Sequence, residues 1–157
     1  MKTIEINIPV EVAKFEELSD TDRHLVELAR EATYRSYSPY SHFRVGAAIA
    51  LDNGEIVTGA NQENVAYPSG TCAERSACFY AGARYPEAKF LTIAIAARDT
   101  NGNFVATPIA PCGACRQALL EYEMRAGHPV RVILTAADSL YILPSVSSLL
   151  PYAFTEF

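Results

Sequence analysis

Residues Phe90–Ala97, FLTIAIAA, form a continuous apolar run that is rich in β-branched side chains. Such a run is typical of a strand that is buried on both faces. It is followed by a predicted helix at Cys112–Ala126, closed by Gly127, and by a second apolar strand at Val130–Leu134. A strand, a helix and a strand in this order favour parallel pairing with helices on the faces of the sheet. These residues therefore indicate an α/β protein.

The residues before this stretch predict two more strands and two helices. Runs at Arg44–Leu51 and Ile56–Ala60 flank an Asn-Gly pair, which is a strong hairpin signal and would make the sheet mixed. Apolar residues at helical spacing predict a helix at Asp20–Ser36, and an alanine-rich segment predicts one at Cys72–Arg84. The segment Ser139–Leu150 is ambiguous, although its second half fits a short helix.

Composition narrows the possible functions. The chain has 157 residues, half of them apolar and a fifth charged, which fits one globular domain. A net charge of −5 without any basic run argues against a sequence-independent grip on nucleic acid. The longest apolar runs, such as Val45–Leu51, are far shorter than the ~20 residues that span a bilayer. We expect a cytoplasmic protein without a membrane partner, in which a group of cysteines points to a metal or to catalysis.

Three of the four cysteines stand at the starts of predicted helices. Cys112 and Cys115 form a Cys-x-x-Cys pair after Pro111, and residues three apart share one helix face, so both thiolates can reach one ion. Helix N-termini favour the thiolate over the thiol. A catalytic zinc site needs a third protein ligand and one open position, and Cys72 suits that role. Cys78 lies deeper in its helix and is expected to be a small buried apolar residue.

Each half of this pattern also has a simpler interpretation. A Cys-x-x-Cys pair alone occurs in structural zinc sites and in redox pairs. A structural zinc site would need a fourth Cys or His, and His24, His42 and His128 are not spaced for it. Thr71-x-x-Glu74 fits a capping box, in which the Glu74 carboxylate only closes the start of a helix.

Taken together, the two halves resemble the nucleobase and nucleoside deaminases, which carry [His/Cys]-x-Glu followed at a distance by Pro-Cys-x-x-Cys. Here Cys72-Ala73-Glu74 precedes PCGACRQ at residues 111–117. Cysteine at the first position, SPYSHFRVGAA at residues 38–48 and GANQEN at residues 59–64 are similar to the small homotetrameric cytidine deaminases of the three-cysteine zinc type. The resemblance runs from about residue 30 to residue 134.

The resemblance implies a three-layer α-β-α sandwich around a mixed five-stranded sheet, formed by a single domain, 1–157, with residues 1–20 as an N-terminal extension. It implies that Cys72, Cys112 and Cys115 hold Zn²⁺, which activates a water, and that Glu74 is the general acid/base and not a ligand. The reaction would convert cytidine or 2′-deoxycytidine to the corresponding uridine and ammonia, in pyrimidine salvage. Arg75 would hydrogen-bond to ligand sulfurs and withdraw negative charge.

The family's matching residues imply how a nucleoside is held. Asn61 and Glu63 lie two apart at the end of a predicted strand, face the same side and would bind a ribose hydroxyl. Phe43 would lie beside the nucleoside, and the backbone N–H of Ala73 would bind the base carbonyl. Phe154 matches an aromatic residue that reaches a neighbouring subunit's site in a homotetramer.

Two alternatives stay open at this stage. The same chemistry could act on an aminonucleoside antibiotic, as in enzymes that resemble blasticidin S deaminase. Otherwise the protein is not an enzyme, the zinc is structural, and Glu74 is only a cap. Editing of polynucleotides is disfavoured by the acidic charge and by the Asn61 and Glu63 pair, which suits a free sugar.

Overall fold

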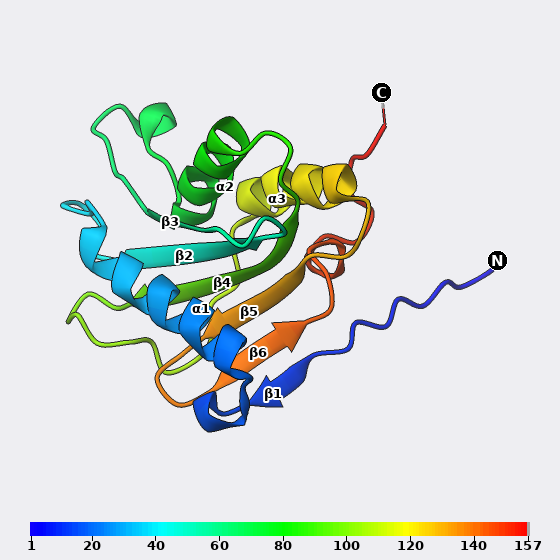
Figure 1. Ribbon diagram of the computed structural model, residues 1–157, viewed down its shortest axis with the longest axis horizontal. Coiled ribbons are helices and arrows are strands. Elements are labelled where there is room, and N and C mark those ends of the chain that lie inside the picture. The colour runs from blue at the N-terminus through cyan, green and yellow to red at the C-terminus, as the bar shows by residue number, and fades with distance from the viewer. Residues whose placement is uncertain (157) are drawn as a thin grey trace.

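The structure, a computed structural model that describes residues 1–156, is a six-stranded sheet with helices on both faces (Figure 1). The sheet has the order β1-β6-β5-β4-β2-β3. The strands are β1 (Glu11–Ala13), β2 (Arg44–Leu51), β3 (Ile56–Ala60), β4 (Phe90–Arg98), β5 (Arg131–Thr135) and β6 (Leu140–Leu143). The helices are α1 (Asp20–Ala32), α2 (Ala73–Arg84) and α3 (Gly113–Ala126), with single 3₁₀ turns η1 (Phe15–Glu17), η2 (Thr33–Arg35), η3 (Tyr67–Ser69) and η4 (Ser147–Leu149).

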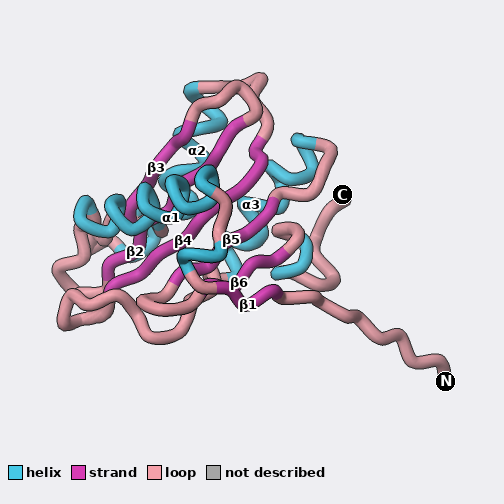
Figure 2. Tube along the Cα trace, turned by 60° about the horizontal axis from the view of Figure 1, so that its bottom comes forward, coloured by secondary structure: helices cyan, strands magenta, loops and turns pink. Residues whose placement is uncertain are grey.

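The predicted parallel pair lies in the middle of this sheet. Strand β4 runs parallel to β5, from Thr92 opposite Arg131 to Ala96 opposite Thr135, and α3 connects them. All other neighbouring strands are antiparallel, including the predicted β2–β3 hairpin. The sheet is therefore mixed, as expected, and both faces of its centre are covered (Figure 2).

Successive side chains of the central strands point to opposite faces, and each face meets a different helix layer. On one side Ala94 and Ala96 of β4 pack with Val26 of α1. On the other side Ile93 and Ile95 pack with residues of α2 and α3. All five side chains are at most 3% exposed. This alternation explains why β4 is apolar at nearly every position.

Glycines allow two helices to approach the sheet closely. A Cβ on Gly46 of β2 would lie 2.2 Å from the backbone oxygen of Ala29 in α1. A Cβ on Gly59 of β3 would lie 2.6 Å from the backbone oxygen of Ala73, the first residue of α2. The first turn of α2 therefore rests directly on β3.

The expected strand number was wrong, since the sheet has six strands and not five. The ambiguous segment 139–150 holds strand β6 and the single turn η4, and β1 comes from the N-terminal extension. Strands β1 and β6 have three and four residues, too few for a periodic pattern to stand out. The first helix also ends earlier than predicted, because α1 gives way to η2 after Ala32. Among the described residues, no helix is both long enough and apolar enough to cross a bilayer.

Candidate metal centre and active site

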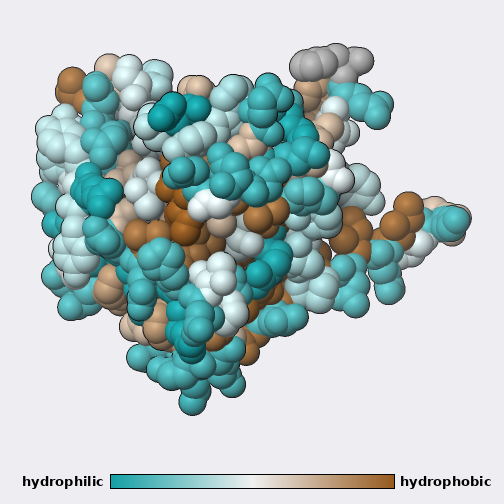
Figure 3. All heavy atoms as spheres, in the orientation of Figure 1, coloured by the Kyte–Doolittle hydropathy of each residue, from teal (hydrophilic) through white to brown (hydrophobic). Residues whose placement is uncertain are grey.

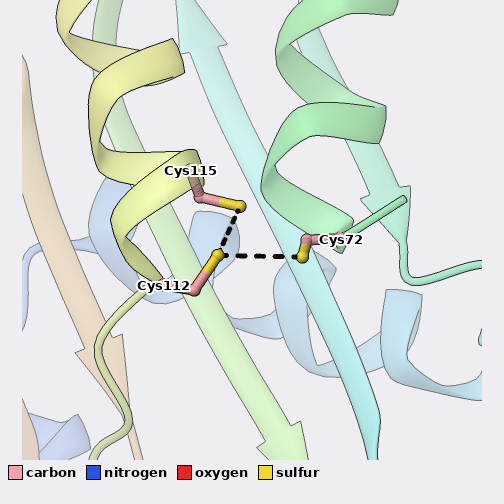
Figure 4. Close-up of side chains that lie close together, drawn as sticks. All are labelled: Cys72, Cys112 and Cys115. Atoms are coloured by element: carbon pink, nitrogen blue, oxygen red, sulfur yellow. Dashed lines mark hydrogen bonds between the residues drawn. The ribbon is translucent and has the colours of Figure 1, made fainter. Parts of the chain in front are cut away.

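Three cysteine sulfurs meet where two helices begin (Figure 4). Cys72 is the N-cap of α2 and Cys112 is the N-cap of α3, both with extended backbone angles, and Cys115 follows in the first turn of α3. The Sγ atoms of Cys72 and Cys112 are 4.0 Å apart, and those of Cys112 and Cys115 are 3.5 Å apart. All three lie within 4.8 Å of one another. Cysteines that are 40 residues apart in the sequence are therefore brought to one point, as the sequence predicted.

The three sulfurs suit a tetrahedral zinc ion. A Zn–S bond of about 2.3 Å places tetrahedral sulfur ligands about 3.8 Å apart, close to the distances found here. Among the described residues, no His, Asp, Glu or further Cys joins this group, which leaves one ligand position open. Three protein ligands with an open position are typical of catalytic zinc sites.

The electrostatics of the group favour a thiolate at Cys72. The pKa of the Cys72 thiol is lowered to about 5, first by the hydrogen bond with Cys115 and then by Arg75. Arg75 lies in the first turn of α2, and its Nη2 donates to the Sγ of Cys72 at 3.8 Å. The pKa of Cys115 is raised, first by its contact with Cys72 and then by burial. Arg75 therefore lies where the sequence analysis placed it, beside a candidate ligand sulfur.

Glu74 is the buried carboxyl group of this site. It lies in the first turn of α2, is 4% exposed, and burial raises its pKa, as does the charge of Cys72. The capping-box interpretation of Glu74 does not hold, because α2 is capped by Cys72 and not by Thr71, and its N-cap makes no side-chain hydrogen bond. Because Cys72 has an extended backbone, Glu74 and the Cys72 sulfur face the same pocket instead of opposite sides of a helix.

That pocket has a volume of about 320 Å³ and joins polar and apolar groups. Its walls include Glu74, Cys72 and Cys112 together with Phe43 and Asn61. The remaining lining is mostly apolar: Ser41, Val45, Ile95, Ala97, Ile109 and Ala110. Strands β2 and β4, helix α2 and the segments next to them thus supply a space of the size of a small ligand, with two of the three cysteines on its wall.

A second, more open hollow of about 500 Å³ adjoins the first and shares Ser41, Asn61 and Cys72 with it. Glu63 and Arg75 line this second hollow. Asn61 and Glu63 therefore lie next to each other along one continuous surface that leads to Cys72.

Hydrogen bonds hold both polar residues in place. The Asn61 Oδ1 accepts from the Ser36 hydroxyl at 2.6 Å and from the Val45 N–H at 2.8 Å, and its Nδ2 donates to the Phe43 carbonyl at 2.9 Å. The Glu63 carboxylate accepts from the backbone N–H groups of Tyr40 and Ser41 and from the Ser41 hydroxyl. The loop before β2 is thereby fastened to the end of β3.

These hydrogen bonds leave Asn61 and Glu63 each with one unused hydrogen-bonding position. Asn61 uses both acceptor sites and one of its two N–H donors. Glu63 uses three of the roughly four acceptor sites of a carboxylate. These hydrogen bonds could not be predicted from the sequence, because each joins residues that are 16 or more positions apart.

The other predicted residues lie in different parts of the structure. Ala73 is buried and is the first residue of α2, so its N–H has no partner within the helix. Phe154 lies on the C-terminal segment, 64% exposed, and does not line either hollow; its carbonyl accepts from Gln117 Nε2 at 2.9 Å. Cys78 is buried outside the three-sulfur group, and burial raises its pKa to about 12.

Arg116 supports the metal centre, a role that the sequence did not predict. Arg116 directly follows Cys115, its Nε donates to the Pro111 carbonyl at 2.7 Å, and its Nη1 donates to the Leu149 carbonyl at 2.8 Å. It therefore ties the residue before Cys112 to the C-terminal segment. Its place beside the Cys-x-x-Cys pair was the only signal in the sequence.

The sequence and the fold are similar to those of known proteins. The family described as "Cytidine and deoxycytidylate deaminase zinc-binding region" matches residues 19–127. A cytidine deaminase from Halalkalibacterium halodurans is 39% identical over 132 residues, which cover 83% of this chain and 92% of that protein. One from Mycobacterium tuberculosis is 42% identical over 106 residues, which cover 66% of this chain and 74% of that protein.

The crystal structure of a cytidine deaminase from Burkholderia pseudomallei superposes with a TM-score of 0.71 at 36% sequence identity, covering 87% of this chain and all of that one. The family match spans all three cysteines of the group and Glu74. The chain belongs to the family of cytidine and deoxycytidylate deaminases with a zinc-binding region.

Proposed function

We propose that this protein is a cytidine deaminase, which hydrolyses cytidine or 2′-deoxycytidine to uridine or 2′-deoxyuridine and ammonia in pyrimidine salvage. The observation that carries the proposal is the pocket that the buried Glu74 lines together with Cys72 and Cys112. A structural zinc site has four protein ligands, whereas this group offers three and adjoins a cavity.

Cys72, Cys112 and Cys115 hold zinc in this proposal. Zinc bound at such a site lowers the pKa of water and so supplies a nucleophile at neutral pH. Three thiolates give the site a surplus of negative charge, and the hydrogen bond from Arg75 to Cys72 offsets part of it.

Glu74 moves the protons of the reaction. Its burial and raised pKa suit a carboxyl group that both accepts and releases a proton during the reaction. It takes a proton from the water whose oxygen bonds to C4 and delivers this proton to N3 of the cytosine ring. It then takes the proton of the new C4 hydroxyl and delivers it to the amino group, which leaves as ammonia while the C4 carbonyl forms. The carboxylate returns to its starting state, so the step needs no further reactant.

The remaining residues orient the nucleoside. Phe43 and the apolar wall of the pocket lie beside the base, whose carbonyl accepts from the N–H of Ala73. The spare N–H of Asn61 and the spare acceptor site of Glu63 form a donor and acceptor pair, which suits a sugar hydroxyl because a hydroxyl both accepts and donates. A free nucleoside thus fits better than a base held within a polynucleotide.

The proposed protein acts in the cytoplasm as a homotetramer. In this proposal the side chain of Phe154 reaches a neighbouring subunit's site, and its exposed position on the C-terminal segment supports this role. This role requires a neighbouring subunit and is the reason for proposing an assembly.

Ammonia release from cytidine, 2′-deoxycytidine, cytosine and blasticidin S by the purified protein tests the proposal. We expect ammonia and a fall in ultraviolet absorbance with the two cytidine nucleosides, and little reaction with free cytosine, which lacks the sugar that Asn61 and Glu63 bind. Reaction with blasticidin S alone would assign the chemistry to an antibiotic substrate. No ammonia from any of the four by the zinc-loaded protein would contradict the proposal.

A further inference from the structure

The N-terminal arm, residues Lys2–Pro9, stands away from the body of the protein (Figures 1 and 2). It belongs to no helix or strand, and strand pairing begins only at Glu11. Residues of this arm and of β1 alternate regularly between apolar and polar side chains. Figure 3 shows hydrophobic residues alternating with hydrophilic ones along this projecting segment.

The apolar members of this alternation form one stripe of five β-branched side chains: Ile4, Ile6, Ile8, Val10 and Val12. Their spacing of two places them on one face of an extended chain. Ile8 packs partly against the core, but the other four are 72%, 53%, 44% and 70% exposed, in chain order. A β-period stripe of this length on an unpaired segment indicates a strand whose partner is another chain.

The protein's own sheet cannot supply that partner. Strand β1 pairs with β6 from Ala13 opposite Leu140 to Glu11 opposite Ile142, and the same register continued places Pro9 opposite Pro144. Neither proline has an N–H for the ladder. A hollow of about 400 Å³ lies at this end of the β1–β6 pair, lined by Pro9, Glu11, Arg131 and residues 142–144. Strand β1 is also the outermost strand of the sheet, so its other edge pairs with no strand among the described residues.

We propose that residues 5–13 pair antiparallel with the same residues of a second copy of this chain, around a two-fold axis at Pro9. The four stripe members within this range, Ile6, Ile8, Val10 and Val12, are symmetric about Pro9, and Ile4 at the end of the stripe falls opposite Lys14 of the second copy. Ile8 then lies opposite Val10 of the second copy, and Ile6 lies opposite Val12 of the second copy. Each apolar pair occurs twice, as in any two-fold interface. Pro9 lies on the axis, opposite Pro9 of the second copy, at a position where the strand ladder needs no N–H donor.

The charges select this register over its neighbour. With the axis at Pro9, Glu5 lies opposite Ala13 of the second copy and Asn7 lies opposite Glu11 of the second copy. With the axis at Ile8 instead, Glu5 would oppose Glu11, and the two lysines at positions 2 and 14 would also oppose each other. Like charges directly opposite in a sheet are destabilising. A two-fold axis at Pro9 is therefore favoured over one at Ile8.

A matched pair of lysine substitutions tests the pairing. Ile6→Lys places a charge in the apolar stripe, opposite Val12 of the second copy, whereas Asn7→Lys places the same charge on the other face, opposite Glu11 of the second copy. In sedimentation equilibrium over a range of concentrations, we expect Ile6→Lys to weaken the association between copies about tenfold or more, because the lost pair occurs twice. Asn7→Lys is expected to keep or tighten it. Equal effects of both variants, or no effect of either, would overturn the proposal.

Cross-linking tests the axis itself. Facing residues of an antiparallel pair have Cα atoms about 4.5–5.5 Å apart, which a disulfide can bridge. Pro9→Cys is expected to form a disulfide-linked pair of chains under mild oxidation, while wild type and Thr3→Cys, which lies far from the axis, form none. Equal cross-linking of the two cysteine variants, or none with Pro9→Cys, would contradict the register. Deaminase activity does not enter either measurement, so the pairing and the proposed function can fail separately.

Discussion

An alanine at Gly59 would test whether the close contact between β3 and α2 places the active-site residues. Its Cβ would lie 2.5 Å from the Ala77 nitrogen and 2.6 Å from the Ala73 oxygen, where ordinary contacts begin at 3.4 Å. Both atoms belong to helix α2, which would have to retreat by about 0.9 Å to bring the nearer contact, at 2.5 Å, to 3.4 Å. Ala73 lies between Cys72 and Glu74, so both would move. A displacement of this order lowers turnover about 100-fold.

The same substitution overpacks the interior, which costs about 1–3 kcal/mol and lowers the Tm by about 2–12 °C in a chain of this size. Gly82→Ala is the matched control, because its Cβ would meet only the Tyr122 side chain, 2.7 Å from the hydroxyl, far from the first turn of α2. Ammonia release and thermal unfolding should show that Gly82→Ala loses stability but keeps its turnover. If Gly59→Ala kept wild-type turnover, the reasoning from this contact would be refuted.

Three further substitutions have distinct expected outcomes. Cys78→Ser should leave the zinc content per chain unchanged in elemental analysis, since Cys78 lies outside the three-sulfur group, and a clear drop would show that it is a ligand. Arg116→Ala removes two hydrogen bonds that a charged group donates to backbone carbonyls. It should lower the free energy of unfolding by about 2–4 kcal/mol, lower the Tm by about 5–15 °C and speed the loss of zinc to a chelator. An unchanged Tm would disprove this role. The pKa of Glu63 is lowered, first by the Ser41 hydroxyl and also by backbone N–H groups of Tyr40 and Ser41. The Glu63 carboxylate therefore stabilises the fold at neutral pH, and this stabilisation is lost as the pH falls through the lowered pKa. The advantage of wild type over Glu63→Gln in unfolding free energy should therefore shrink below about pH 4, and a difference that is constant with pH would argue against it.

The elements that the sequence predicted well have strong local patterns. The hairpin of β2 and β3 was predicted with its observed bounds, because two apolar runs flank an Asn-Gly turn. The helices that carry the cysteines begin one residue later than predicted, since Cys72 and Cys112 are caps and not helical residues. This small shift decides the chemistry, because it turns the Cys72 sulfur and Glu74 toward one pocket.

The features that the sequence did not predict depend on contacts between distant segments. The short strands β1 and β6 each pair with a neighbour, and their three and four residues are too few to set their bounds from the sequence. The bonds of Arg116 join residues that are 33 apart in the sequence. The clamp of Glu63 on Ser41 spans 22 residues. Such contacts follow from the three-dimensional arrangement and not from local periodicity.

The proposed reaction depends on proton transfer by Glu74 beside the three-sulfur group. Glu74→Gln keeps the size of the side chain and removes its ability to carry a proton, and the zinc content of the same preparation shows whether the metal centre is intact. We expect one zinc per chain, a retained Tm and a loss of cytidine turnover of about 10²–10⁴-fold or more. Near-normal turnover by zinc-loaded Glu74→Gln would contradict it.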